Sequence, residues 1–277
     1  MTLSPQHIAH FQDRGFLLLE DQFSAQELDL LRRRADVVLA GRDERTVMEA
    51  SGTAVRSVYG PHEIDPVFAV LGRHPRLVGP AQRLLDGDVY VYQSKLNVKS
   101  PFDGEFWEWH QDYVFWRNED RMPAPRVLTA AVYIDDVDDF NGPLVLIPGS
   151  HREGVLRCPT PTDLASDAPN WHSHVSARLK YAIHRDVLGG LARRYGLHAP
   201  KARAGALLLF DGNIAHASST NISPFARSLI LYTYNHVANA PARPTRPGFL
   251  VSRDTRAIAP VDDDSLLADA AAAQEAR

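Results

Sequence analysis

The sequence predicts an α+β fold in which helices come first and an antiparallel double-sheet barrel follows. Residues up to Gly87 contain apolar positions at helical spacing. From Asp88 onward, five segments rich in Val, Leu, Ile and Tyr are bounded by Gly, Pro, Asn and Asp, as strands are. Helices followed by many strands are typical of an α+β domain with a jelly-roll type of barrel.

The elements follow in order along the chain. Two helices open it, with a short strand, "GFLLLE", between them. The second helix begins with a capping-box pattern, Ser24 and Glu27, ahead of Leu28, Leu31 and Val38 at roughly helical spacing. A third helix is expected near "PRLVGPAQRLLDG", and the expected strands cover 88–100, 126–137, 142–150, 205–212 and 227–237.

Two segments depart from this pattern. Residues 151–204 form a polar loop with a helix-like "RDVLGGLARRYG", which we interpret as an excursion from the barrel that is suited to act as a lid. No internal repeat or linker between domains is visible, so we expect one domain over 1–258. The remaining stretch, 259–277, has little to bury and is expected to be a flexible tail.

Composition narrows the class of protein. With 277 residues, 44% hydrophobic and 23% charged, the chain is typical of a soluble globular protein. A net charge of −4 favours neither nucleic acid nor an anionic membrane. Cys158 is the single cysteine, which excludes an internal disulfide and suits the cytoplasm. We expect a cytoplasmic protein, because the N-terminus lacks a signal-peptide core and no apolar run is long enough to span a membrane. Its expected partner is a small molecule, and its expected state is a monomer or a homodimer.

The stretch "FWEWHQDYVFW", residues 106–116, surrounds His110 and Asp112 with six aromatic residues. Side chains two apart on a strand share a face, so His110 and Asp112 point the same way if residues 108–112 are extended. An imidazole and a carboxylate suit a divalent first-row metal, and a second histidine completes the ligand set of non-heme iron oxygenases. A single His-x-Asp is weak evidence by itself.

A later segment strengthens this interpretation. Of the twelve histidines, His216 alone lies just after a strongly apolar strand with an arginine, Arg227, soon after it. An arginine buried in an apolar strand needs a carboxylate partner, and its fork geometry matches a bidentate carboxylate. That carboxylate belongs either to another side chain of the protein, in a structural ion pair, or to a bound ligand.

The strand "VYVYQSKLNV" changes from apolar to polar along one face. Strict alternation places Val89, Val91, Gln93, Lys95 and Asn97 together. Two arrangements account for this pattern: an inner wall of the barrel that reaches a solvent-filled opening, or an outer face of the sheet in contact with solvent.

Together, "WHQD", "NGPLVLIPGSH" and "HASSTNISPFARS" resemble the phytanoyl-CoA dioxygenase family of iron(II)- and 2-oxoglutarate-dependent dioxygenases, and within it the ectoine hydroxylases. The resemblance covers roughly residues 8–240 and implies a double-stranded β-helix, or cupin-like barrel. It implies a hydroxylase that uses Fe(II), 2-oxoglutarate and O2, acts on an unactivated C–H of a small polar or zwitterionic metabolite, and releases succinate and CO2.

The resemblance also implies roles for individual residues. His110, Asp112 and His216 match the iron ligands, and Arg227 matches the residue that binds the distal carboxylate of 2-oxoglutarate. Ser218 and Asn97 match further cosubstrate contacts. The substrate side of the pocket is matched by Gln93, Lys95, Trp116, Phe210 and Gln111, and we expect Trp107 and Trp116 to face the site.

Departures from the ectoine hydroxylases lie in the pocket. Lys95 replaces an arginine, Leu231 replaces an aromatic residue, and Phe115 and Arg117 replace polar residues, which favours a substrate other than ectoine. Asp112 argues against halogenation, because related halogenases have a small residue there.

Other functions remain open from sequence alone. The same machinery could act on an acyl-CoA or carrier-tethered substrate, or carry out desaturation or cyclisation. A non-catalytic jelly-roll binding protein would not need the complete ligand set, and a zinc or manganese hydrolase of cupin-like fold would not need Arg227.

Overall fold

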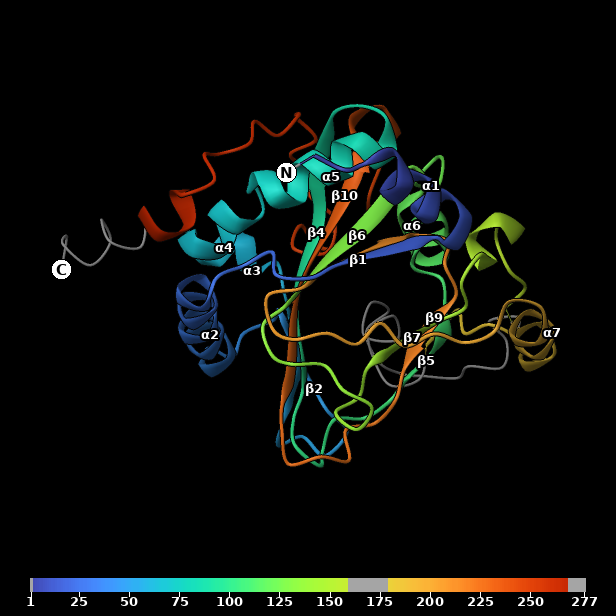
Figure 1. Cartoon of the computed structure of the whole chain (residues 1–277), viewed down its shortest axis with the longest axis horizontal. Coiled ribbons are helices and arrows are strands. Elements are labelled where there is room, and N and C mark those ends of the chain that lie inside the picture. The colour runs from blue at the N-terminus through green and yellow to red at the C-terminus, as the bar shows by residue number, and fades with distance from the viewer. Residues whose placement is uncertain (1, 159–178, 269–277) are drawn as a thin grey trace.

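Two β-sheets face each other and form a barrel in the computed structural model, which describes residues 2–158 and 179–268 (Figure 1). The larger sheet has the strand order β1-β8-β6-β10-β4-β3-β2, and the smaller has the order β5-β9-β7. Every pairing is antiparallel. The strands are β1 Phe16–Leu19, β2 Thr46–Met48, β3 Val55–Tyr59, β4 Val89–Lys99, β5 Trp107–His110, β6 Val127–Tyr133, β7 Leu144–Leu146, β8 Leu207–Asp211, β9 His216–Ser218 and β10 Arg227–His236. The predicted α+β class with a double-sheet barrel is confirmed.

Helices from the first part of the chain cover the outer face of the large sheet. They are α1 Pro5–Arg14, α2 Ala25–Ala40, α3 Pro61–Ile64, α4 Pro66–Leu71 and α5 Pro75–Leu85. Two later helices, α6 Asp112–Asp120 and α7 Arg185–Tyr195, pack in separate apolar clusters, and short 3-10 turns form at η1 Ser150–Glu153 and η4 Val237–Asn239. Leu31, Leu71 and Leu77 from the helices join Leu96 and Ile230 from the sheet in the main core, all without solvent exposure. The small sheet lies on the opposite side of the large one (Figure 1).

Local sequence signals explain where the helices begin. The predicted capping box forms at α2, where the Ser24 hydroxyl accepts from the Glu27 amide and the Glu27 carboxylate accepts from the Ser24 amide at 2.7 Å. Helix α5 ends at Leu85, because Asp86 takes the left-handed conformation. Among the described residues, no helix is both long and apolar enough to cross a membrane.

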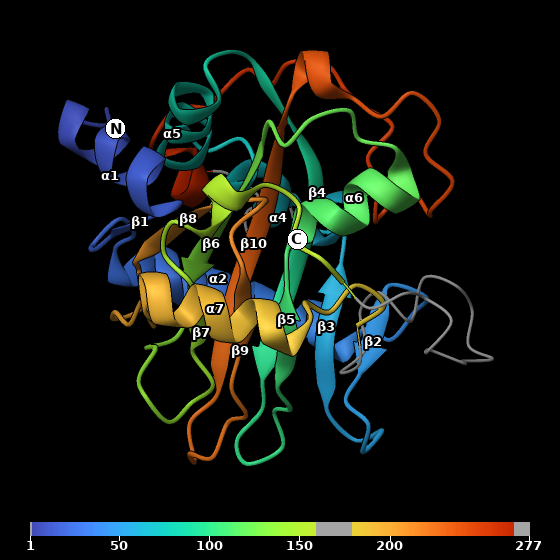
Figure 2. The ribbon, with the colours of Figure 1, turned by 90° about the vertical axis from the view of Figure 1, so that its right-hand side faces the viewer.

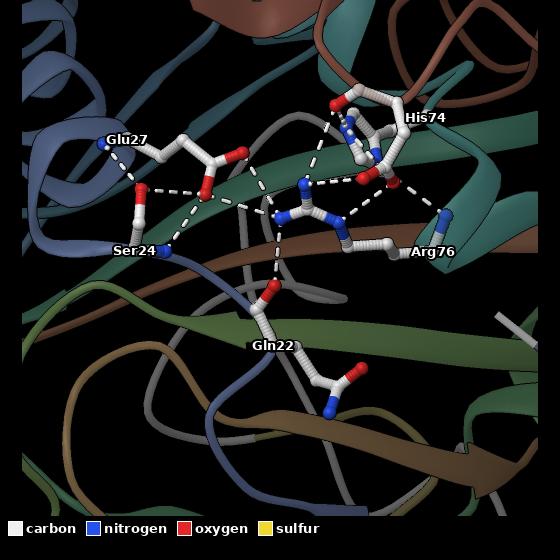
Figure 3. A network of polar contacts seen from close by, with 6 residues as sticks. Gln22, Ser24, Glu27, His74 and Arg76 are labelled. Carbon is white, nitrogen blue, oxygen red and sulfur yellow. Dashed lines mark hydrogen bonds and ion pairs between the residues drawn. The ribbon is translucent and has the colours of Figure 1, made fainter.

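The described part of the C-terminal segment contacts the rest of the fold. Leu266 is 1% exposed and belongs to the main core. Asp263 pairs with Arg76 at 2.8 Å, and Arg76 also binds Glu27 at 2.9 Å, as Figure 3 shows for the latter pair. An apolar side chain and an ion pair therefore attach residues 259–268 to the rest of the fold, while the flexibility of the tail stays a prediction. The rest of the tail lies outside the described residues.

Part of the excursion expected over residues 151–204 lies within the described residues. Helix α7 forms where the sequence indicates, and it lies across the small sheet (Figure 2). Its Leu191 packs with Ala215 and Ile147 in a separate apolar cluster. Residues 159–178 lie outside the described residues, so the role of the excursion as a lid stays a prediction.

Candidate active site

A cavity between the two sheets collects most of the residues that the sequence singled out. Along each strand every second side chain points into the barrel, so inward side chains of both sheets meet in this cavity. It is lined by Lys95, Asn97, Trp107, His110, Asp112, Leu144, Phe210, His216, Ala217, Ser218, Leu229 and Leu231.

Three ligand-type side chains meet at one end of this cavity. The nearest atoms of His110, Asp112 and His216 all lie within 4.8 Å of one another. His110 Nε2 is 3.5 Å from one Asp112 oxygen, and His216 Nε2 is 3.8 Å from the other. The extended segment expected over 108–112 ends at Gln111, and Asp112 is the first residue of α6. Strand β5 and the first turn of α6 therefore supply the pair, while β9 supplies His216.

The orientation and charge of these groups suit a divalent metal. The Nδ1 atoms of His110 and His216 lie 2.6 Å and 3.1 Å from the backbone carbonyls of Glu108 and Ile214, and donation to these carbonyls leaves both Nε2 atoms as acceptors. Burial lowers the pKa of His216 to about 4, so its imidazole is neutral. Although burial opposes it, the neighbouring histidines hold the pKa of Asp112 below its ordinary value. Neutral imidazoles and an ionised carboxylate are the forms that bind metal.

Arg227 is fully buried and has no carboxylate partner among the described residues. Its Nε and Nη2 donate to the Gly142 carbonyl at 3.1 Å and 2.6 Å, and its Nη1 donates to Asn97 Oδ1 at 3.0 Å. Burial lowers the pKa of Arg227 to about 10, which leaves it charged at neutral pH. A buried guanidinium whose hydrogen-bond acceptors are all neutral lacks the carboxylate that would compensate its charge, and a bound carboxylate would supply it.

Ser218 lines the cavity with an unsatisfied polar group, whereas Arg227 is not among the lining residues and is connected to them through its bond to Asn97. Its Oγ is buried and has no hydrogen-bond partner among the described residues. Asn97, which lies opposite Leu229 of β10, also lines the cavity. The orphaned hydroxyl and the uncompensated guanidinium fit a small dicarboxylate such as 2-oxoglutarate, which supplies acceptors to both.

Lys95 projects into the cavity beside two aromatic rings. Its Nζ lies 5.0 Å from the ring centroid of Trp107 and 5.8 Å from that of Tyr59. Burial lowers the pKa of Lys95, and among the described residues its ammonium has neither a hydrogen-bond acceptor nor an ion pair. Phe210 completes this wall, with its ring centroid 5.2 Å from that of His216.

A β-bulge in β4 corrects the predicted face of this strand. Val91 pairs with Tyr234 and Gln93 with Thr233, so Tyr92 is an extra residue and the alternation changes phase there. Lys95 and Asn97 line the cavity as expected, whereas Val91 packs against the outer core. The prediction that Val89 and Val91 share a face with Lys95 and Asn97 is therefore wrong.

Three predicted pocket residues lie outside the lining of the cavity. The Gln93 side chain donates to the Leu250 carbonyl at 3.1 Å. Trp116 packs edge-on against Tyr92, with 5.5 Å between ring centroids. Gln111 has no exposed surface and binds backbone groups. Their roles in substrate binding stay predictions.

The arrangement agrees with known proteins. A family model described as phytanoyl-CoA dioxygenase (PhyH) matches residues 11–229. The chain belongs to the phytanoyl-CoA dioxygenase family. An L-proline trans-4-hydroxylase from Streptomyces griseoviridis is 42% identical over 252 residues, covering 91% of this chain and 94% of the relative. An ectoine dioxygenase from Halomonas elongata is 35% identical over 269 residues, covering 93% and 79%.

A solved member of the family has the same fold. The structure of EctD from S. alaskensis with 2-oxoglutarate and 5-hydroxyectoine superposes with a TM-score of 0.81 and 34% identity, covering 94% of this chain and 87% of that chain. A further structure of that protein contains bound Fe. The predicted family, jelly-roll fold, enzyme class and cofactors are confirmed: this phytanoyl-CoA dioxygenase family member is a dioxygenase that uses iron(II), 2-oxoglutarate and O2.

Sequence reasoning missed one buried charge beside the site of this family member. Arg56 of β3 lies 3.9 Å from the ring centroid of Trp107 and pairs with Glu49 at 2.7 Å. Its Nη2 also donates to the Phe106 carbonyl at 2.9 Å. The argument applied to Arg227, that an arginine within an apolar strand needs a partner, also applies to "VRSVY" and would have found it.

Proposed function

We propose that this dioxygenase hydroxylates an unactivated C–H bond of proline or a similar small cyclic amino acid. The observation that carries the proposal is the Lys95 ammonium, which has no ion-pair or hydrogen-bond partner among the described residues and lines the cavity that also contains the cluster of His110, Asp112 and His216. A substrate carboxylate would satisfy this ammonium, and the adjacent apolar wall would hold a small ring.

In this proposal His110, Asp112 and His216 bind the iron. The support is their ligand chemistry, their spacing within 4.8 Å and the free Nε2 atoms. Iron held there would, with 2-oxoglutarate and O2, supply the oxidant for C–H cleavage: one oxygen atom of O2 enters the hydroxylated product, the other enters succinate, and CO2 is released.

Arg227 binds the distal carboxylate of 2-oxoglutarate, and Ser218 and Asn97 donate further hydrogen bonds to the cosubstrate. The support is the absence of a carboxylate partner for Arg227 among the described residues, together with the orphaned Ser218 hydroxyl. Because Asn97 Oδ1 accepts from Arg227, its side-chain amide nitrogen remains available as a donor to the ligand.

The aromatic and aliphatic wall restricts the substrate. Trp107, Phe210 and Leu231 exclude water from the reacting carbon and position the ring between Lys95 and the metal ligands. An acyl-CoA carries several phosphates and favours a strongly basic entrance, whereas Lys95 is a single ammonium. Proline is the first candidate because of the 42% identical relative that carries its name.

Ectoine is the second candidate. The likeness to ectoine dioxygenases of 34–36% identity favours it, and so does a TM-score of 0.81 to EctD. Lys95 would bind a carboxylate in either substrate. The ectoine hydroxylases have an aromatic residue at the position of Leu231, and this difference favours proline.

The test is a succinate-release assay with iron(II) and 2-oxoglutarate. L-proline, ectoine and D-proline are added separately, and the hydroxylated product is identified by mass spectrometry. We expect L-proline to raise succinate release above the basal rate and to gain one oxygen atom. If no compound raises the basal rate, the substrate proposal fails while the dioxygenase class stands.

The proposed partner is the small-molecule substrate alone. A net charge of −4 gives no support for nucleic acid binding. Cys158, the single cysteine, is consistent with the reducing cytoplasm in which such metabolites are processed. A monomer or homodimer, as predicted, satisfies this proposal, because all the residues assigned to the site come from one chain.

A further inference from the structure

Gln111, which lies between two of the proposed iron ligands, uses its whole side chain to bind backbone. Its Nε2 donates to the Gly154 carbonyl at 2.8 Å and to the Asn213 carbonyl at 2.6 Å. Its Oε1 accepts from the Leu156 amide at 2.8 Å. Because carbonyls accept and a backbone amide donates, these partners fix which end of the Gln111 side chain is nitrogen. Both of its N–H groups then have an acceptor.

One of these bonds, to Asn213, joins the segments that carry the metal ligands, and the other two attach the same side chain to the residues after η1. Asn213 lies in the turn between β8 and β9, three residues before His216, and the next residue, Ile214, holds His216 Nδ1 through its carbonyl. Gly154 and Leu156 follow η1. One buried amide therefore connects the segment of His110 and Asp112 to the loop that delivers the third ligand.

The backbone turns from strand to helix at this residue. β5 ends at His110, Gln111 is extended with φ −117° and ψ 129°, and α6 begins at Asp112. The direction of this turn sets the 3.5 Å separation of His110 Nε2 and the Asp112 carboxylate. Metal constellations tolerate errors of only about 0.5 Å, so a group that locks the turn affects ligation without touching the metal.

We propose that Gln111 is a positioning residue for the metal centre rather than a substrate contact. This inference rests on the proposed iron ligands. The bond from the Tyr113 amide to the Gly212 carbonyl, at 2.9 Å, runs beside it but fixes only the α6 side of the turn.

The test replaces Gln111→Met, which keeps the volume and removes every hydrogen bond, and Gln111→Glu, which keeps an acceptor for Leu156 but loses both donors. Iron(II) affinity is measured by anaerobic calorimetry on the full chain, and the d–d absorption of the cobalt(II)-loaded protein reports ligand geometry. We expect the dissociation constant to rise by about 10- to 100-fold, as when groups supporting metal ligands are removed. The cobalt spectrum should change as well.

Asn239→Leu is the matched control. Asn239 is also a buried amide with three hydrogen bonds, donating to the Ala124 carbonyl at 2.6 Å and to Asn235 Oδ1 at 2.8 Å, and accepting from the Ala124 amide at 2.8 Å. Loss of stability alone would affect it similarly. We expect its iron affinity and cobalt spectrum to match those of the parent.

Parent-like affinity and spectrum in the Gln111 variants overturn the inference, as does an equal loss in Asn239→Leu. If Gln111→Met does not fold, Gln111→Glu decides. His216→Ala separates the two levels: if it binds iron(II) as tightly as the parent, the proposed metal centre itself fails. If it does not, while the Gln111 variants bind like the parent, only the positioning role fails.

Discussion

Replacing Lys95 with methionine is expected to weaken substrate binding while leaving the barrel intact. Methionine keeps the unbranched stem that packs beside Tyr59 and Trp107 and removes the ammonium. This ammonium is attracted by the Asp112 charge but has no hydrogen-bond partner among the described residues, so its removal leaves no protein donor or acceptor without a partner. The free energy of unfolding should therefore hold or rise.

The magnitude follows from the bond that is lost. A hydrogen bond to a charged group contributes about 1.5–3 kcal/mol. Since about 1.4 kcal/mol corresponds to a factor of ten, the Michaelis constant for the substrate should rise about 10- to 150-fold. Arg227 binds the cosubstrate in our proposal, so the Michaelis constant for 2-oxoglutarate should change little.

The assay measures succinate release against substrate concentration and, separately, against 2-oxoglutarate concentration. Lys201→Met is the matched control, because Lys201 pairs with Asp139 at the surface, 2.7 Å away. Thermal unfolding of both variants checks the fold. If Lys95→Met retains the parent's Michaelis constant for substrate, Lys95 does not bind the substrate and the preference for an anionic compound is refuted.

Three further predictions test neighbouring groups. His216→Ala should remove a proposed iron ligand and abolish iron-dependent succinate release without unfolding the chain, as checked by circular dichroism; retained activity would contradict the assignment. Arg227→Lys keeps the charge but loses the fork, so the Michaelis constant for 2-oxoglutarate should rise several-fold, and a change confined to the other substrate would contradict it. Burial lowers the pKa of Lys99 to about 6 in the folded chain, against about 10.4 unfolded, so the unfolded chain binds more protons between these values and stability rises with pH. Lys99→Met should therefore gain stability over the parent at pH 6 and less at pH 9 in urea unfolding, and a gain that does not depend on pH would exclude this pKa.

The sequence predicted the parts of the fold whose signal is local. The capping box at Ser24 and the apolar run before His216 depend on near neighbours, and both appear where expected. His110 and Asp112 could be paired before the structure because residues two apart on an extended segment share a face, and the resemblance to the family connected His216 to them.

Other features depend on contacts that no local pattern contains. The bulge at Tyr92 follows from the register between β4 and β10, and it shifts Lys95 relative to Val91 in a way that strict alternation does not predict. The family resemblance placed Gln111 on the substrate side of the pocket, whereas its bonds to Gly154 and Asn213 join residues that are distant in sequence and could not be predicted. The burial of Leu266 could not be predicted, because the core that it joins is built from helices and strands distant in sequence.

The position of Leu266 also bears on how the chain acquires its structure during synthesis. Leu3 and Phe11, near the start, share the main core with Leu266, and β1 pairs with β8 from the far end of the sequence. A ribosome releases residues one after another, so the first helices emerge long before their permanent neighbours exist. Contacts this distant in sequence slow folding. The apolar side chains of the early segments therefore stay exposed until the later part of the chain has been synthesised. We expect chaperones that cover such surface to raise the yield of this protein more than that of a domain built from local contacts.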